Sequence, residues 1–223
     1  MSSNVQEKTG AQGAAIYSRW LLAIYDWWVL GVVNSYAWRC RTTKVLLPFF
    51  RENMGKNHLD IGVGTGYFLS HAKIPADVHM TLADLNPNAL EASKAKMGRP
   101  DTECILHDIF EPLPTKQRFN SVSMFYLLHC MPGPPSRKTA IFDHLKFNLT
   151  RDGVVYGATI LGTGVKHNLF GKAVLKLGNT VGFFDNRKDS EEAVVESLRR
   201  NFHEVESRTV GAILLFKAKK PLV

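Results

Sequence analysis

Residues 58–67 read His58-Leu59-Asp60-Ile61-Gly62-Val63-Gly64-Thr65-Gly66-Tyr67, and this stretch decides the fold. A short apolar run enters a turn with three alternating glycines, and an amphipathic segment leaves it. Glycine is needed there because the chain must turn tightly and bring its backbone against a ligand, which a Cβ atom would obstruct. The pattern therefore predicts a strand, a nucleotide-binding loop and a helix, in this order.

The glycine spacing and the acid before it favour one kind of nucleotide ligand. A dinucleotide-binding fingerprint is Gly-x-Gly-x-x-Gly, whereas the third glycine here is Gly66, and Tyr67 stands where that fingerprint needs glycine. The carboxylate of Asp60 would repel a pyrophosphate, but it suits a ligand with an ammonium group. The loop therefore predicts S-adenosylmethionine (SAM) rather than NAD.

The sequence features that follow the glycine loop occur in the order expected of a βαβ unit. The run 79–83 predicts a second strand that ends at Asp84, and Asp84 follows the loop at close to the spacing at which an acid binds ribose hydroxyls. Asn86-Pro87 then opens a helix that is rich in helix formers and ends at Gly98. Simple turn chemistry is the alternative for Asp84, but its register with Asp60 favours the ribose role.

A third strand over residues 102–106 leads to another acid, Asp108. A carboxylate at this place could accept a hydrogen bond from an adenine amino group. An aspartate after a strand is also a common cap or turn residue, so both interpretations of Asp108 stay open.

These pieces resemble the class I SAM-dependent methyltransferases. The matching parts are Asp60-x-Gly62-x-Gly64-x-Gly66, Asp84, Asp108-Ile109, and residues 119–130 with their Leu128-His129 ending. The resemblance implies a Rossmann-like α/β fold: a doubly wound seven-stranded sheet, mostly parallel, with an antiparallel C-terminal hairpin. It also implies a SAM site at the carboxyl ends of the first strands, with these cofactor-binding residues: Asp60, Gly62, Gly64, Gly66, Asp84, Leu85, Asp108, Ile109, Phe125 and Tyr126.

The downstream sequence continues the alternation of strands and helices. The predicted elements are a strand over 119–126, a helix from Pro134 to about Leu149, a turn at Arg151-Asp152-Gly153, a strand over 154–161, a helix from Ser190 to Phe202, and a hairpin of strands 203–210 and 212–217. Residues 162–189 are rich in glycine and aromatic residues, and we expect an inserted helix or lid there. Together with the glycine loop, these elements predict one SAM-binding methyltransferase domain over residues 51–223.

The N-terminal part of the chain has two different compositions. Residues 1–13 are polar and small, which predicts a disordered tail without the apolar centre of a secretory signal. Residues 14–50 contain a long apolar and aromatic run, which predicts an N-terminal helical cap over the sheet. Arg19, Asp26 and Asn34 make insertion into a membrane costly, so we expect no transmembrane span. A peripheral membrane contact is the alternative, through Trp20, Trp27, Trp28 and Trp38 with Arg39 and Arg41 beside the last.

The cysteine content and the net charge indicate where the protein works and which partners it is expected to bind. Cys40, Cys104 and Cys130 have no metal-like spacing, and an odd count argues against a disulfide framework, so we expect reduced thiols in a cytoplasmic protein. The formal net charge of +8 permits a nucleic-acid or protein methyltransferase. The basic residues are scattered, however, and no Asn/Asp-Pro-Pro-Tyr/Phe motif follows the fourth strand, so no nucleic-acid partner is expected.

Methyl transfer requires little covalent chemistry from the protein, because the SAM sulfonium is already an activated donor. A base is needed only if the acceptor must lose a proton. His129 is the candidate, since it follows the fourth strand, at the edge where donor and acceptor should meet. A buried histidine or a mere cofactor contact is the alternative.

The segments near this edge provide candidate acceptor contacts: Tyr25, Trp28, His167 and Phe184. No histidine has a spacing with carboxylates that would mark a metal site, so no metal is expected. The sequence thus predicts methyl transfer to a small, aromatic or apolar metabolite, as in secondary metabolite biosynthesis. A SAM-binding protein without transferase activity, such as a cyclase or a regulator, is the alternative; the oligomeric state is not predicted.

Overall fold

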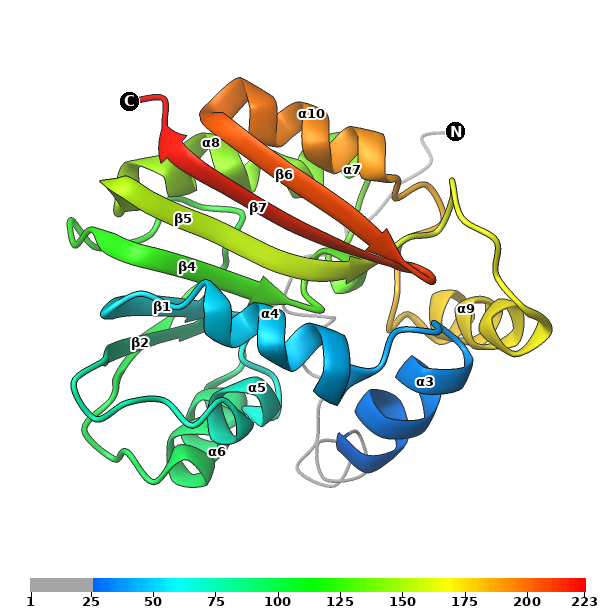
Figure 1. Ribbon diagram of the computed structural model, residues 1–223, viewed down its shortest axis with the longest axis horizontal. Helices are drawn as coiled ribbons and strands as arrows, with labels where there is room; N and C mark the ends of the chain where they lie inside the picture. Colours follow the sequence, from blue (N-terminus) through cyan, green and yellow to red (C-terminus); the bar gives the residue numbers. More distant parts are fainter. Residues whose placement is uncertain (1–25) are drawn as a thin grey trace, which may run out of the picture.

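Seven strands form one sheet in the order β3-β2-β1-β4-β5-β7-β6 in the computed structural model, which describes residues 26–223 (Figure 1). The strands are β1 (Asn57–Ile61), β2 (His79–Asp84), β3 (Glu103–Leu106), β4 (Phe119–Phe125), β5 (Leu149–Ile160), β6 (Phe202–Val210) and β7 (Ile213–Pro221). The first five run parallel, whereas β7 pairs antiparallel with both β5 and β6. The predicted mostly parallel sheet with an antiparallel C-terminal hairpin is confirmed.

Helical segments connect these strands and cover the sheet. They are η1 (Asp26–Val33), α3 (Asn34–Tyr36), η2 (Thr42–Leu46), α4 (Leu47–Glu52), α5 (Tyr67–His71), α6 (Pro87–Met97), η3 (Leu128–Cys130), α7 (Pro135–Thr139), α8 (Ile141–Leu145), η4 (Lys146–Asn148), α9 (Leu169–Val181) and α10 (Glu191–Asn201). The predicted caps are present: the Asn86 side chain accepts a hydrogen bond from the Asn88 N–H at 3.0 Å, and Ser190 accepts one from the Ala193 N–H at 3.3 Å. Capping of this kind satisfies the first free N–H groups of a helix and so fixes where α6 and α10 begin.

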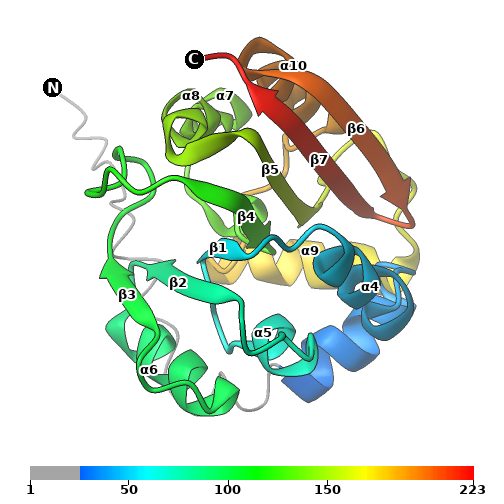
Figure 2. The ribbon, with the colours of Figure 1, turned by 60° about the vertical axis from the view of Figure 1, so that its left-hand side comes forward.

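The sheet separates two apolar cores. Tyr156 and Leu215 point into the core that contains residues of α4 and α5, whereas Val155 and Phe216 point into the core that contains residues of α8 and α10. This alternation follows from the two-residue period of a strand. Helices therefore cover both faces, with α4 and α5 on one side and α8 and α10 on the other (Figure 2).

The structure differs from the prediction at the start of β5, in the helix before it, and at the end of the last strand, which reaches Pro221. The strand β5 begins at Leu149, so the predicted turn at Arg151-Asp152-Gly153 is wrong. These residues lie within the strand, and the pairing of β4 with β5 shifts its register between Phe119 and Ser121, which accommodates the extra length. The helix predicted from Pro134 to about Leu149 is present, but as three short pieces (α7, α8 and η4) rather than one.

Part of the predicted N-terminal cap packs into the core. Residues 1–25 lie outside the described residues, and with them the predicted tail over 1–13, Trp20 and Tyr25; the side chain of Trp27 does too. Trp38 is fully buried, so it cannot take part in the membrane contact that the sequence left open, whereas Trp28 is exposed. No helix among residues 26–223 is long and apolar enough to cross a membrane.

Candidate functional site

A pocket lies at the carboxyl ends of the parallel strands. The chain reaches it directly after β1, β2, β3 and β4, which is where open α/β sheets bind their ligands. The lining residues are Leu30, Ile61, Gly62, Val63, Gly64, Thr65, Tyr67, Phe68, Ala83, Asp84, Leu85, Asn86, Ala89, His107, Asp108, Ile109, Phe110, Phe125, Tyr126, Leu127, Cys130, Met131, Pro132, Gly182 and Phe183. Eight of the ten residues that the resemblance assigns to the cofactor are in this set, the exceptions being Asp60 and Gly66.

The three loop glycines have different roles. All have positive φ angles, which favour glycine: 71° for Gly62, 54° for Gly64 and 68° for Gly66. A Cβ on Gly62 would lie 2.8 Å from Leu127, and one on Gly66 would lie 2.9 Å from the backbone of Ser93 in α6. A Cβ on Gly64 would meet nothing closer than 4.0 Å. Gly62 and Gly66 therefore allow close packing within the protein, whereas Gly64 leaves space open beside the pocket.

Asp84 connects the glycine loop to the end of β2. Its carboxylate accepts hydrogen bonds from the Asn86 N–H at 2.8 Å and from the Gly64 N–H at 3.4 Å. Burial raises the pKa of this carboxyl above its usual value, and the backbone N–H donors oppose that shift. The side chain is only partly buried and lines the pocket, so it combines a structural role with access to a ligand.

Asp108 caps a turn and also lines the pocket. Its carboxylate accepts a hydrogen bond from the Phe110 N–H at 3.1 Å, and its carbonyl accepts one from the Glu111 N–H at 3.0 Å. The turn interpretation that the sequence left open is therefore present in the structure. The adenine role stays a prediction, supported by the place of Asp108 beside Ile109 on the pocket wall.

Asp60 lies beneath the loop rather than on the pocket wall. It is buried, and the Ser123 hydroxyl donates to its carboxylate. Burial raises the pKa of Asp60 to about 7, and the hydrogen bond from Ser123 opposes part of that shift. The sequence suggested that this carboxylate meets an ammonium group of the ligand; that role stays a prediction, and Asp60 is not among the residues that line the pocket.

A chain of buried hydrogen bonds continues from Asp60 to the far end of β1. His58 Nε2 is 2.9 Å from Ser123 Oγ, and His58 Nδ1 is 2.6 Å from Ser121 Oγ, which in turn accepts from the Gly55 N–H at 2.7 Å. Burial lowers the pKa of His58 to about 3, so the ring is neutral at physiological pH and one nitrogen donates while the other accepts. Every member of this network has a partner, which makes β1 and β4 a firm base for the glycine loop.

His129 lies behind the pocket wall. The ring is buried, its Nδ1 is 3.3 Å from Thr159 Oγ1, and it accepts a 3.4 Å hydrogen bond from the Ile160 N–H. Its edge-to-face neighbours are Tyr126, at 5.4 Å between ring centroids, and Phe184, at 5.0 Å. Burial, together with the charge of Lys138, lowers the pKa of His129 to about 3. His129 is not among the pocket-lining residues, so the geometry favours the buried-histidine interpretation over the base interpretation.

The structure does not bring the predicted acceptor contacts together at the pocket. Phe184 packs on His129 and on Trp38, and His167 packs edge-to-face on Trp38 at 6.0 Å between ring centroids. Neither lines the pocket, nor does Trp28, and Tyr25 lies outside the described residues.

Other residues, which the sequence analysis did not assign to the site, line the pocket. They are Leu30, Met131, Pro132, Gly182 and Phe183. Phe183 and Phe184 are adjacent in sequence, but the ring of Phe184 packs against His129 and Trp38, and Phe183 lines the pocket. Met131 and Pro132 follow η3, and their place a few residues beyond the end of the fourth strand is the signal that could have identified them.

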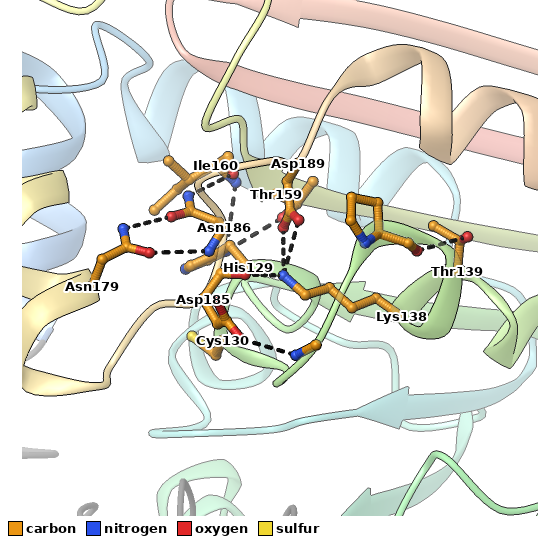
Figure 3. Close-up of polar contacts among 12 residues, drawn as sticks. His129, Cys130, Lys138, Thr139, Thr159, Ile160, Asn179, Asp185, Asn186 and Asp189 are labelled. Carbon is orange, nitrogen blue, oxygen red and sulfur yellow. Dashed lines mark hydrogen bonds and ion pairs between the residues drawn. The ribbon is translucent and has the colours of Figure 1, made fainter. Parts of the chain in front are cut away.

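A buried ion pair holds this side of the pocket together (Figure 3). Lys138 Nζ lies 2.9 Å and 2.8 Å from the two carboxylate oxygens of Asp189, and it also donates to the Asp185 carbonyl. The Asp185 N–H donates to the His129 carbonyl at 2.9 Å, and the Gly133 N–H donates to the Asp185 carboxylate at 2.8 Å. These contacts tie the segment after α9 to η3 and α7, so they fix the course of the chain just beyond Phe183.

No group of three or more His, Cys, Asp or Glu side chains that could hold a metal ion occurs among residues 26–223. Among the residues that line the pocket, the titratable side chains are Asp84, Asp108, His107, Tyr67, Tyr126 and Cys130. His107 is held at the rim, where its Nε2 lies 3.0 Å from the Glu111 carbonyl.

Comparisons with known proteins agree with this geometry. Residues 36–201 match a family model described as a methyltransferase domain. The chain is 49% identical over 212 residues to a physcion biosynthesis cluster O-methyltransferase of Aspergillus chevalieri, covering 94% of this chain and 96% of that protein. It is 46% identical over 212 residues to the N-methyltransferase vrtF of Penicillium aethiopicum, covering 95% of this chain and 89% of that protein. The fold is similar to that of the N-methyltransferase NodS from Bradyrhizobium japonicum WM9 in complex with S-adenosyl-L-homocysteine, with a TM-score of 0.58, 16% identity, and coverage of 79% of this chain and 84% of that chain.

Proposed function

This chain belongs to the class I SAM-dependent methyltransferases, and we propose that it methylates a hydroxyl group of a small aromatic metabolite. The observation that carries the choice of acceptor is the set of apolar residues that line the pocket in addition to the predicted cofactor residues. Leu30, Met131, Pro132 and Phe183 are among them, and an apolar lining suits a flat, poorly hydrated molecule. The O-methyltransferase relative at 49% identity supports oxygen as the acceptor atom.

The residues present fit SAM. Gly64 leaves open space beside the pocket, the Asp84 carboxylate is available for ribose hydroxyls, and Asp108 and Ile109 line the end proposed for adenine. When bound, SAM supplies a methyl group that its sulfonium has already activated. The protein's own contribution is then to hold the acceptor in line with that methyl group and to keep water away.

We propose that His129 supports the pocket wall rather than removing the acceptor proton. The ring is buried behind Tyr126, it accepts the Ile160 N–H, and its pKa of about 3 makes it a weak base. The cyclase or regulator alternative shares the SAM site, so only formation of a methylated product separates it from the proposed function.

His129→Gln tests the role of this side chain. We expect turnover within about tenfold of the unaltered protein at every pH, because glutamine can still accept the Ile160 N–H and general base catalysis would be worth about 10²–10⁴-fold. The measurement is the pH profile of turnover for both proteins. If turnover falls by more than about 100-fold, and falls most at low pH, His129 instead acts as the base that removes the acceptor proton.

The proposed function itself is tested with pairs of acceptors that differ in one group. The protein is incubated with SAM and with aromatic molecules that carry a hydroxyl, an amine or neither, and the products are identified by mass spectrometry. We expect a gain of one methyl group on the hydroxyl compounds. Transfer to the amines alone would favour N-methylation, the activity named for the vrtF relative. Binding of SAM without any methylated product across the series would contradict the proposal.

A further inference from the structure

The helix α9 exposes an apolar face to solvent. Leu169, Ala173, Leu177 and Val181 follow each other every four residues, which places them on one side of a helix, and Phe170 lies beside them. Leu169 is 86% exposed, Leu177 is 64% exposed and Val181 is 50% exposed. We refer to these five residues as the α9 apolar face. An amphipathic helix normally turns such a face toward the core, so its outward direction requires an explanation.

The opposite side of α9 is built to lie against the protein. Its buried residues are Gly171 and Gly178. A Cβ on Gly171 would lie 2.9 Å from the Ala37 carbonyl, and one on Gly178 would lie 2.4 Å from the ring of Phe184. Asn168 caps the helix by accepting from the Gly171 N–H at 2.7 Å, and it donates to the Tyr36 carbonyl at 2.7 Å. Because these close contacts need glycine, α9 cannot rotate to bury its apolar face.

Positive charge surrounds the α9 apolar face. Lys172 and Lys176 are exposed and occupy the turns between Leu169 and Leu177, and Lys166 is exposed just before the helix. The sequence from residue 162 to residue 184 contains no aspartate or glutamate. Lysines beside an exposed row of leucine, valine and phenylalanine are the pattern of helices that lie in the headgroup region of a membrane.

The place of α9 links this surface to the pocket. The helix lies at the periphery of the molecule (Figure 1), and its C-terminal end continues into Gly182 and Phe183, which line the pocket. A membrane against the α9 apolar face would therefore lie close to the part of the pocket wall that Gly182 and Phe183 form. Apolar small molecules concentrate in bilayers, so this arrangement would shorten their way to the enzyme.

We propose that the α9 apolar face binds the surface of a membrane that contains anionic lipids. The apolar side chains enter the boundary between headgroups and acyl chains, and Lys166, Lys172 and Lys176 contact the lipid phosphates and carboxylates. The contact is peripheral, and it does not depend on the identity of the methyl acceptor or on methyl transfer itself.

Co-sedimentation of the full-length chain with vesicles tests the proposal. Two vesicle types are compared, phosphatidylcholine alone and phosphatidylcholine mixed with phosphatidylserine. We expect binding to the mixed vesicles, a loss of at least about tenfold in Leu169→Gln/Leu177→Gln, and a loss of about tenfold in Lys172→Gln/Lys176→Gln that high salt reproduces. The matched control is Phe147→Gln: Phe147 is 55% exposed beside Lys146 in η4, which precedes the N-terminal end of β5, whereas α9 follows the C-terminal end of that strand. It should bind vesicles like the unaltered protein.

Several outcomes would overturn the proposal. One is no binding to either vesicle type, and another is equal binding by the leucine variant and the Phe147→Gln control. A third is a dimer in sedimentation velocity without vesicles that the leucine variant converts to a monomer, because the α9 apolar face would then bind a second copy of the chain. The variants replace exposed side chains, so their thermal unfolding should match that of the control and separate loss of binding from loss of fold.

Discussion

Gly64→Val is expected to abolish SAM binding while the protein stays folded. A valine side chain at this position meets no protein atom within 4 Å of its Cβ other than the Gly62 carbonyl at 4.0 Å, so it would grow into the space beside the pocket that we assign to the ligand. We expect a loss of affinity of at least about 100-fold, which corresponds to about 2.8 kcal/mol. Isothermal titration calorimetry with SAM measures this directly.

Gly98→Val is the matched control for that experiment. Gly98 has a φ of 65°, close to the 54° of Gly64, and a Cβ there also meets nothing within 4 Å. It ends α6 away from the pocket, so the substitution introduces the same kind of backbone strain, worth about 1–3 kcal/mol, without blocking the ligand. Equal SAM affinities in the two variants would show that the loop is not the SAM site.

Lys138→Met is expected to lower the free energy of unfolding by about 3–5 kcal/mol, because it leaves the Asp189 carboxylate buried without its cation. Both side chains are almost completely buried, and their oxygens and nitrogen lie within 2.9 Å. The double variant Lys138→Met/Asp189→Leu should recover much of that loss, since two apolar side chains can replace a buried ion pair at little cost. Chemical denaturation of the three proteins measures the differences.

The loss in Lys138→Met should depend on pH. Burial already raises the pKa of Asp189 above its usual value, and Lys138 opposes that shift, so removing the lysine raises the pKa further. An acid with a raised pKa in the folded state costs stability as the pH rises through the carboxylate range. The difference in free energy of unfolding between the unaltered protein and Lys138→Met should therefore be small near pH 4 and increase toward pH 7. A gap that stays constant would mean that lost packing, and not the stranded carboxylate, causes the destabilisation.

The parts of the fold that could be predicted are those with local causes. Three alternating glycines after an apolar run allow few conformations other than a tight ligand-binding turn, and Asn86 and Ser190 stand where caps are needed. The hairpin around Gly211 followed from the same kind of signal, a glycine between two alternating runs. The start of β5 could not be predicted from a local signal, because the shifted register that places Arg151 in the strand depends on pairing with β4, which lies elsewhere in the sequence.

The lining of the pocket agrees with the prediction where backbone position decides which residue lines it, and differs where side-chain direction decides. Asp84 follows from its place at the end of a strand. In contrast, the hydrogen bond from Ser123 on the neighbouring strand sets the direction of the Asp60 side chain. Phe184 was expected to contact the acceptor, but its ring packs on His129, and Phe183 lines the pocket instead. Such contacts join residues more than fifty positions apart and leave no periodic trace in the sequence.

The glycines on the inner side of α9 have a consequence for the movement of molecules through the pocket. The fully buried residues of α9 are glycines, and its Val174 and Leu175 are only partly buried against the core, whereas α10 fully buries Val194, Val195 and Leu198. Local unfolding therefore costs less free energy in α9 than in α10, since such costs scale with buried apolar contacts. The C-terminal end of α9 continues into Gly182 and Phe183 on the pocket wall. We therefore expect local opening of this one helix to admit a wide acceptor and release its product, while the sheet and the glycine loop keep their positions.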